Sequence, residues 1–125
     1  MAVLVDMTDE FDEHRFRALL DLAGPATARE LATRLDEDLT AVADAMSAAG
    51  VSADRQVLRA QSHVLLAIAG TVGANRLYRL SVQMNGLARA SEGGPFGELL
   101  TEIRALLDHL IARIRSARVQ LAAEG

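Results

Sequence analysis

The stretch Leu31–Gly50, LATRLDEDLTAVADAMSAAG, decides the fold class, because its large apolar residues recur at steps of three or four. Such steps place them on one face of an α-helix. Thr27 followed by Glu30 is a capping-box pattern that begins this helix, and Gly50 ends it. The apolar face consists of Leu31, Leu35, Leu39, Val42 and Met46. The stretch therefore predicts a long amphipathic helix that needs other helices to cover this face.

The segments on either side show the same periodicity, and short breaks separate them. Thr8 is the expected cap of the first helix, Gly24-Pro25 stops that helix, and Ser52 is the expected cap of the third. The loop Glu92–Pro95 precedes the last helix. Besides the long second helix, helices are expected over residues 8–23, 52–71, 74–90 and from 96 onward. The fold class is therefore all-α, and we expect an antiparallel four-helix bundle with a short N-terminal capping helix.

The composition fits one helical domain that spans residues 1–125. Half of the residues are apolar and only 3% are aromatic, which favours helix almost throughout. The chain has no cysteine, which excludes disulfides and thiolate metal sites. No apolar run approaches the roughly 20 residues of a membrane span, and the N-terminus MAVLVDMTDE lacks the basic flank of a secretory signal. We expect a cytoplasmic protein that does not bind membranes, with a monomer as the simplest state.

The third helix contains a histidine that does not belong to its apolar face. At 100° per residue, His63 points away from the predicted core face, which consists of Val57, Leu58, Gln61, Val64, Leu65, Ile68 and Val72. Its neighbours one turn away include Ala60, Ala67 and Gly70, whose small size leaves space around the imidazole. His63 is therefore expected on the surface, where another protein has access to it. His14 and His109 lie on polar sides of their helices, and no metal-site spacing links the three histidines.

These features resemble the histidine-containing phosphotransfer (HPt) domain of bacterial phosphorelays. The resemblance rests on His63 with Gly73 ten residues later, on the small residues between them, and on the helix-loop-helix that follows. It extends to the leading stretch DEHRFRALLDLAG and to the long second helix. The resemblance implies that an exposed histidine, here His63, accepts a phosphoryl group from one partner aspartate and passes it to another. Leu66 and Ala67 stand where the family pattern His-x-x-Lys-Gly has its last two residues.

The resemblance implies that a positively charged side chain helps to hold the phosphoryl group, and because the chain contains no lysine at all, any such side chain would be an arginine. Arg59 precedes His63 by one turn, and Arg89 faces it if Gly73 folds the third and fourth helices into a hairpin. Counting a comparable number of residues to either side of Gly73 places Asn85 opposite His63. There Asn85 can accept a hydrogen bond from a ring N–H of His63 and so fix the tautomer of the imidazole. The expected docking surface comprises Arg55, Leu66, Ala67 and Gly70.

The resemblance also implies which chemical groups the partner contributes. The aspartate and its Mg²⁺ belong to a response-regulator receiver domain, so this chain needs no cofactor or metal of its own. It is expected to act as a carrier in two-component signalling, and so to be a phosphoprotein rather than a self-sufficient enzyme. Its expected partners are receiver domains and a hybrid histidine kinase. Arginines beside His63 complement the acidic receiver pocket.

Two alternatives remain open at the level of sequence. The first is a degenerate HPt-like protein that docks onto receiver domains or kinases without carrying phosphate, which Leu66 favours. The second is a helix-turn-helix DNA-binding protein, because TARELATRLDEDLTAVADAMSAAG has the Ala-Leu spacing of that motif. The turn of that motif would be Leu35–Asp38, where three acids stand, and the net charge is −4. Both features disfavour contact with phosphates, so no nucleic-acid partner is expected.

Overall fold

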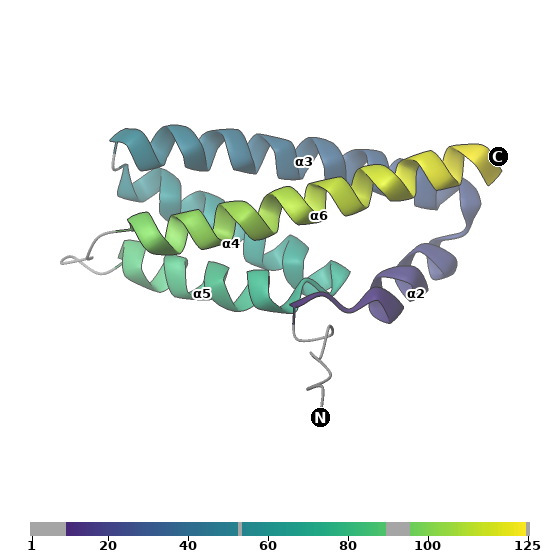
Figure 1. Ribbon diagram of the computed structural model, residues 1–125, viewed down its shortest axis with the longest axis horizontal. Coiled ribbons are helices and arrows are strands. Elements are labelled where there is room, and N and C mark those ends of the chain that lie inside the picture. Colours follow the sequence, from purple (N-terminus) through teal and green to yellow (C-terminus); the bar gives the residue numbers. More distant parts are fainter. Residues whose placement is uncertain (1–9, 53, 90–95, 125) are drawn as a thin grey trace, which may run out of the picture.

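The computed structural model describes residues 10–52, 54–89 and 96–124. Within these ranges the elements are α2 (Glu13–Ala23), α3 (Pro25–Ser52), α4 (Arg55–Val72), α5 (Asn75–Arg89) and α6 (Gly97–Glu124), without any strand (Figure 1). The predicted all-α class is confirmed. The predicted cap Thr8 and the loop Glu92–Pro95 lie outside the described residues. None of the described helices has the length and apolar character needed to cross a membrane.

Aspartates cap two helices for which the sequence predicted other caps. The helix that ends at Ala23 begins only at Glu13, and the Asp12 side chain accepts a hydrogen bond from the Arg15 N–H at 3.1 Å. Helix α4 begins at Arg55, where the Asp54 side chain accepts from the Val57 N–H at 3.2 Å. The predicted start at Ser52 was therefore wrong. Asp and Ser are about equally good N-caps, so residue type alone did not distinguish the two positions.

Helix α3 begins two residues earlier than predicted and also ends later. Its first residue is Pro25, which suits the first helical position because a missing N–H costs nothing there. The predicted cap Thr27 therefore lies within the first turn, and the helix continues past Gly50 to Ser52. The predicted stop after α2 is confirmed, since Gly24 has a φ of +82° and lies outside both helices.

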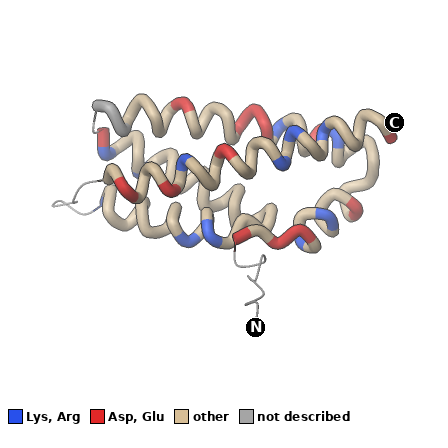
Figure 2. The backbone as a smooth tube through the Cα atoms, viewed as in Figure 1, with Lys and Arg blue, Asp and Glu red and all other residues tan. Residues whose placement is uncertain are grey.

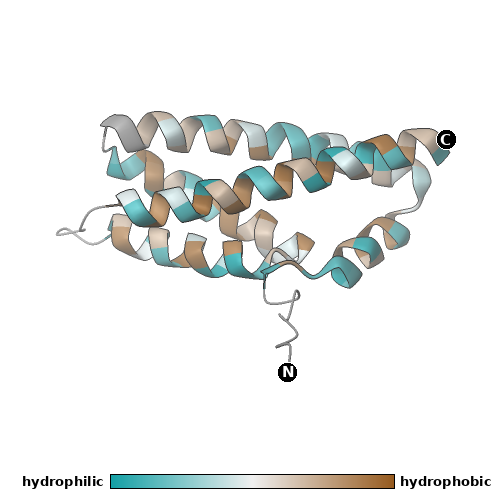
Figure 3. Cartoon of the chain, in the orientation of Figure 1, coloured by the Kyte–Doolittle hydropathy of each residue, from teal (hydrophilic) through white to brown (hydrophobic). Residues whose placement is uncertain are grey.

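The four longer helices lie lengthwise beside one another, as Figure 1 shows. The most extensive contacts join α4 to α5 and α3 to α6, while α3 also packs on α4 and α5 on α6. Helix α2 packs on α3 and α4. Apolar positions alternate with polar ones along α6 in Figure 3, as an amphipathic helix requires. The predicted face of α3 is confirmed in the core, with Leu31 half-buried and Leu35, Leu39, Val42 and Met46 buried.

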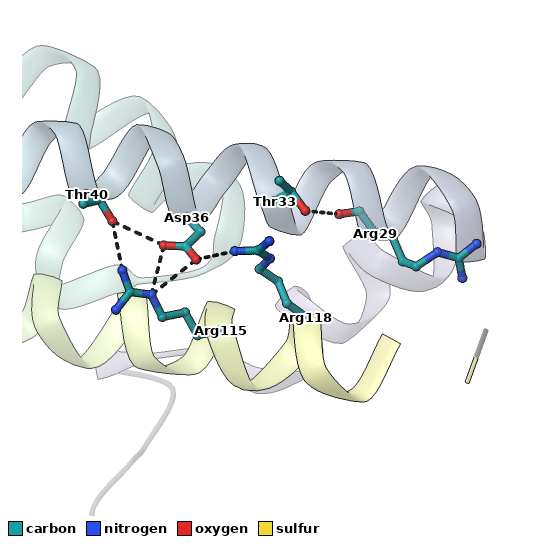
Figure 4. A network of polar contacts seen from close by, with 6 residues as sticks. All are labelled: Arg29, Thr33, Asp36, Thr40, Arg115 and Arg118. Carbon is teal, nitrogen blue, oxygen red and sulfur yellow. Dashed lines mark hydrogen bonds and ion pairs between the residues drawn. The ribbon is translucent and has the colours of Figure 1, made fainter. Parts of the chain in front are cut away.

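Helix α3 also turns one carboxylate inward, and Figure 4 shows the contacts that compensate its burial. The Asp36 side chain is only 10% exposed and accepts hydrogen bonds from Arg118 at 2.6 Å and from Arg115 at 3.1 Å. The Thr40 hydroxyl donates to it at 3.3 Å. Burial alone raises the pKa of Asp36, but the hydrogen bonds from Arg118 and Arg115 outweigh it and hold the pKa below its ordinary value. This network ties α3 to α6.

The continuity of α3 bears on the helix-turn-helix alternative. Residues 35–38, which would form the turn of that motif, are helical, and α3 runs through them without a break. One of the three acids in this stretch, Asp36, is engaged with α6. The segment is therefore one continuous helix and not two helices joined by a turn.

Helix α2 is fixed to α6 by an ion pair next to an aromatic ring. Arg113 donates to both carboxylate oxygens of Glu13, and the Nη2–Oε2 distance is 3.0 Å. Its guanidinium carbon also lies 5.0 Å from the centre of the ring of Phe16, which is fully buried. The hydrogen bond from Arg113 lowers the pKa of Glu13 against the opposing effect of burial. Helix α2 is thus anchored through charge as well as apolar burial.

Candidate functional site around His63

The candidate site lies on a hairpin made of α4 and α5. Gly73 joins the two helices with a φ of +85°, and its N–H donates to the carbonyl of Ala69. Glycine suits this left-handed cap because a Cβ is strained at such a φ. The predicted reversal at Gly73 is confirmed, and the side chains of α5 lie alongside those of α4.

The buried face of α4 differs from the predicted one. It consists of Leu58, Ser62, Leu65, Ala69 and Val72. Val64 was expected in the core but is 42% exposed, and Val57, Gln61 and Ile68 are only half-buried. Because α5 packs extensively on α4, the buried face is centred on the side of Ser62 and Ala69, whose small size permits close approach. Because valine is more hydrophobic than serine, the sequence pattern predicted that Val64 is buried. In the structure Ser62 is buried instead.

His63 is exposed, as the sequence predicted, and it lines an open hollow between α4 and α5. The hollow is bounded by Gln56, Arg59, Ala60, His63, Asn85 and Arg89. Three predicted neighbours, Arg59, Asn85 and Arg89, therefore meet at His63. Arg59 comes from the preceding turn of α4, and Asn85 and Arg89 come from α5 across the hairpin. Gln56 and Ala60 complete the wall but were not predicted as site residues.

The hairpin is positively charged although the chain as a whole carries a net charge of −4. Helices α4 and α5 contain five arginines and no aspartate or glutamate. Figure 2 shows the contrast with α3 and α6, where acidic and basic residues are interspersed. No carboxylate is among the residues that line the hollow. The hollow therefore suits an anionic group or an acidic protein surface.

Asn85 bonds to the backbone of α4 rather than to His63. Its Nδ2 donates to the carbonyl of Arg59 at 3.0 Å and approaches the Ser62 hydroxyl at 3.4 Å. The Ser62 hydroxyl donates to the same carbonyl at 3.1 Å. Within the described part of the chain, no hydrogen bond joins Asn85 to His63.

The predicted docking residues take up different environments. Ala67 is exposed and Leu66 is half-buried. Arg55 is also half-buried and donates to the Leu87 carbonyl at 3.3 Å, so it ties α4 to α5 and does not line the hollow. Gly70 does not clear space for a partner, because a Cβ at this position would lie 3.3 Å from the Tyr78 ring. The small residue accommodates a tyrosine of the same chain.

Two large exposed residues of α5, Tyr78 and Val82, were not predicted as site residues. Their exposed fractions are 40% and 44%. With Asn85 and Arg89 they follow steps of four, three and four, which places all four on one side of α5. This spacing was a signal available in the sequence. Tyr78 touches α4 at Gly70, so an apolar area adjoins the face that carries His63.

The other histidines lie away from this hollow. His14 is exposed on α2, and His109 is exposed on α6. In the ranges that the structure describes, no group of three or more His, Cys, Asp or Glu residues is placed to hold a metal ion.

Comparisons with known proteins identify no relative of this chain. No model of a protein family matches the chain, and neither the curated proteins nor the solved structures give a match. A functional assignment therefore depends on the site itself.

Proposed function

We propose that this chain is a histidine phosphocarrier of the HPt type, which accepts a phosphoryl group on His63 from a receiver-domain aspartate and passes it on. The observation that carries the proposal is the placement of an exposed His63 within a capped helix, in one hollow with Arg59, Asn85 and Arg89. In this proposal α3 to α6 form an antiparallel four-helix bundle and α2 caps it. The carrier is a cytoplasmic monomer.

The chemistry requires little of this chain beyond an accessible nucleophile. The lone pair of a neutral imidazole nitrogen attacks the phosphorus of the aspartyl phosphate. A nitrogen–phosphorus bond forms, the phosphorus–oxygen bond to the aspartate breaks, and the carboxylate leaves with its electron pair. The reverse sequence returns the phosphoryl group to a second aspartate. The receiver domain supplies the aspartates and their Mg²⁺, so the chain itself needs no cofactor.

Arg59 and Arg89 supply the positive charge that the lysine supplies in the HPt family. Both are exposed and line the hollow of His63, whereas Leu66 occupies the lysine position. A guanidinium matches the geometry of phosphate oxygens and stays charged throughout. Phosphoryl transfer depends mainly on positioning and charge neutralisation, so these two residues are the ones that matter most after His63.

The docking face extends from the hollow along α4 and α5. The arginines of the hairpin attract an acidic receiver pocket and raise the rate of encounter. Tyr78, Val82 and Ala67 are exposed on the same hairpin and offer apolar contact. We therefore add Tyr78 and Val82 to the docking residues and assign Arg55 and Gly70 to supporting the hairpin.

The decisive experiment is transfer from a set of phosphorylated receiver domains, scored as acid-labile label on this chain. Label is expected on the wild type and on His14→Gln and His109→Gln, and it should be lost in His63→Gln. Binding of receivers by His63→Gln should persist, because the docking face is intact. Label that survives in His63→Gln would contradict the assignment.

A docking protein without phosphotransfer is the second candidate, and Leu66 favours it. Its half-buried aliphatic side chain cannot neutralise phosphate at the position where the family has lysine. The same experiment separates the two functions. A wild-type chain that binds receivers but takes no label from any of them would be a docking protein.

A further inference from the structure

A groove lies between α3 and α6, on helices that do not line the hollow of His63. On α3, Arg29, Thr33 and Asp36 are four and three residues apart, so they share one side of that helix. The α3–α6 groove has a volume of about 480 Å³, within the roughly 300–1,000 Å³ of ligand sites. The residues that line it are Arg29, Thr33, Asp36, Arg115, Arg118, Val119 and Ala122.

Asp36 holds two arginines of this groove in place. Figure 4 shows Arg115 and Arg118 reaching from α6 toward Asp36 on α3. The carboxylate accepts hydrogen bonds from Nε of Arg115, from Nη1 of Arg118 and from the Thr40 hydroxyl, and its side chain is only 10% exposed. Both carboxylate oxygens are therefore occupied. Asp36 orients the two guanidiniums and is not available to bind a cation.

The arginines keep N–H groups that Asp36 does not use. Within the described residues, no hydrogen bond involves Nη1 of Arg115 or Nε and Nη2 of Arg118. These two side chains are 58% and 41% exposed, so a ligand has access to them. The Arg29 side chain makes no hydrogen bond or ion pair in this part of the chain, and Figure 4 shows it apart from Asp36. Three guanidiniums against one carboxylate leave a surplus of two positive charges.

We propose that the α3–α6 groove binds the phosphate group of an organic phosphate monoester. Such a group carries nearly two negative charges at pH 7, which matches the surplus of the groove. Guanidinium N–H groups match the spacing of phosphate oxygens. Val119, which is 71% exposed, and Ala122 form an apolar wall for the organic part of the ligand. The groove binds its ligand without reacting with it, and this inference does not depend on the proposed function.

The test is a titration of the whole chain with phenyl phosphate and with inorganic phosphate, followed by ¹H–¹⁵N NMR. Saturable shifts are expected at the backbone amides of Arg29, Thr33 and Val119. Phenyl phosphate should bind severalfold more tightly than inorganic phosphate, because its ring contacts the apolar wall. Arg29→Ala should weaken binding about 10-fold, as the loss of one charge-assisted hydrogen bond implies. The matched control is Arg34→Ala, which removes an exposed arginine of α3 outside the groove and should change nothing.

Val119→Asp is the second variant, and it should also weaken binding because its carboxylate repels phosphate. Both substitutions should preserve the fold, since Arg29 makes no side-chain contact of this kind and Val119 is largely exposed. A short phosphoserine peptide, titrated in parallel, identifies the source of the monoester. Binding tighter than that of phenyl phosphate points to a phosphorylated protein and weaker binding to a small molecule, and either result supports the groove.

Two outcomes would overturn this inference. The first is the absence of saturable binding up to about 10 mM phenyl phosphate, a concentration above that of any useful site. The second is binding that survives Arg29→Ala and Val119→Asp but is lost in Arg59→Ala or Arg89→Ala, because the anion would then occupy the hollow of His63. That second result would leave the proposed function standing. Loss of phosphotransfer in His63→Gln would likewise leave the groove unaffected.

Discussion

The backbone N–H of Asp12 donates to the carbonyl oxygen of Gly73 at 2.8 Å, which joins the segment before α2 to the turn between α4 and α5. Asp12 also caps α2 through its side chain. Asp12 thus caps the start of α2 and also fixes this helix to the hairpin that carries His63. The contact is close, because a Cβ on Gly73 would lie 3.1 Å from the Asp12 carbonyl oxygen.

Gly73→Ala is therefore expected to destabilise the fold by about 2 kcal/mol, since alanine is strained at a φ of +85° and also crowds Asp12. The free energy of unfolding in urea measures the change. Gly86→Ala is the matched control. It lies within α5 with no atom close to the added methyl, so it should stabilise by about 0.5–1 kcal/mol. A Gly73→Ala variant as stable as the wild type would refute this contact.

Low pH should weaken the network around Asp36 that ties α3 to α6. The folded-state pKa of Asp36 lies below its ordinary value of 3.8, because hydrogen bonds from Arg118 and Arg115 outweigh the effect of burial. The network therefore contributes its full stability above the unfolded pKa and loses it as the pH falls through the folded-state pKa. Unfolding free energies measured between pH 7 and 3 should decline at the acid end. In Asp36→Asn this part of the decline should disappear.

At pH 7, Asp36→Asn should cost about 1–2 kcal/mol, because the buried carboxylate is lost while its arginine partners remain partly exposed and can return to water. Asp38→Asn is the control two residues away. Its carboxylate is half-exposed and 3.9 Å from Arg34, so the change should stay within about 0.5 kcal/mol. Equal effects of the two substitutions would mean that burial of Asp36 has no energetic consequence.

The helix content and the face of α3 followed from the sequence because spacing alone determines which residues share a helix face. The burial of Leu35, Leu39 and Met46 could be predicted without knowing which helix packs against α3. The face of α4 did depend on a partner, since close contact with α5 buries Ser62 and leaves Val64 partly exposed. Hydropathy does not record which neighbour approaches a helix, so this part of the fold was not predictable.

The candidate site was predictable to the extent that Gly73 fixes the reversal of the chain. Counting outward from it brought Arg89 and Asn85 to His63. The count could not reveal that Asn85 bonds to the backbone of α4, or that Gly70 makes room for the Tyr78 ring. Both facts depend on distances between helices that a sequence pattern does not contain.

Arg59→Ala and Arg89→Ala are each expected to slow phosphoryl transfer to His63 about 10-fold, because each removes a charge from the hollow. Rapid-quench transfer from a phosphorylated receiver measures the rate at saturation. Arg34→Ala, on an exposed part of α3, is the control for the loss of one positive charge. If both variants keep the wild-type rate, neither arginine replaces the missing lysine.

The reciprocal change, Leu66→Lys, places an amine at the position where the HPt family has it. A phosphocarrier should tolerate this substitution or transfer faster, because Leu66 is only half-buried and the amine can extend to solvent. The same rapid-quench assay gives the rate. A rate below that of the wild type in a folded variant would count against phosphate being held on this side of His63.

The exposed apolar residues of α5 give the sharpest test of the docking face. Val82→Asp is expected to weaken receiver binding about 10-fold, because it removes apolar contact and sets a negative charge against an acidic partner. Titration calorimetry measures the affinity. Val119→Asp makes the same change at a residue that is 71% exposed on α6, compared with 44% for Val82, and it should leave binding unchanged.

Transfer to His63 at saturating receiver should be the same in both variants, since neither residue lines the hollow. Equal affinities of the two variants would place the receiver on another face, and the exposure of Tyr78 and Val82 would then have no part in docking.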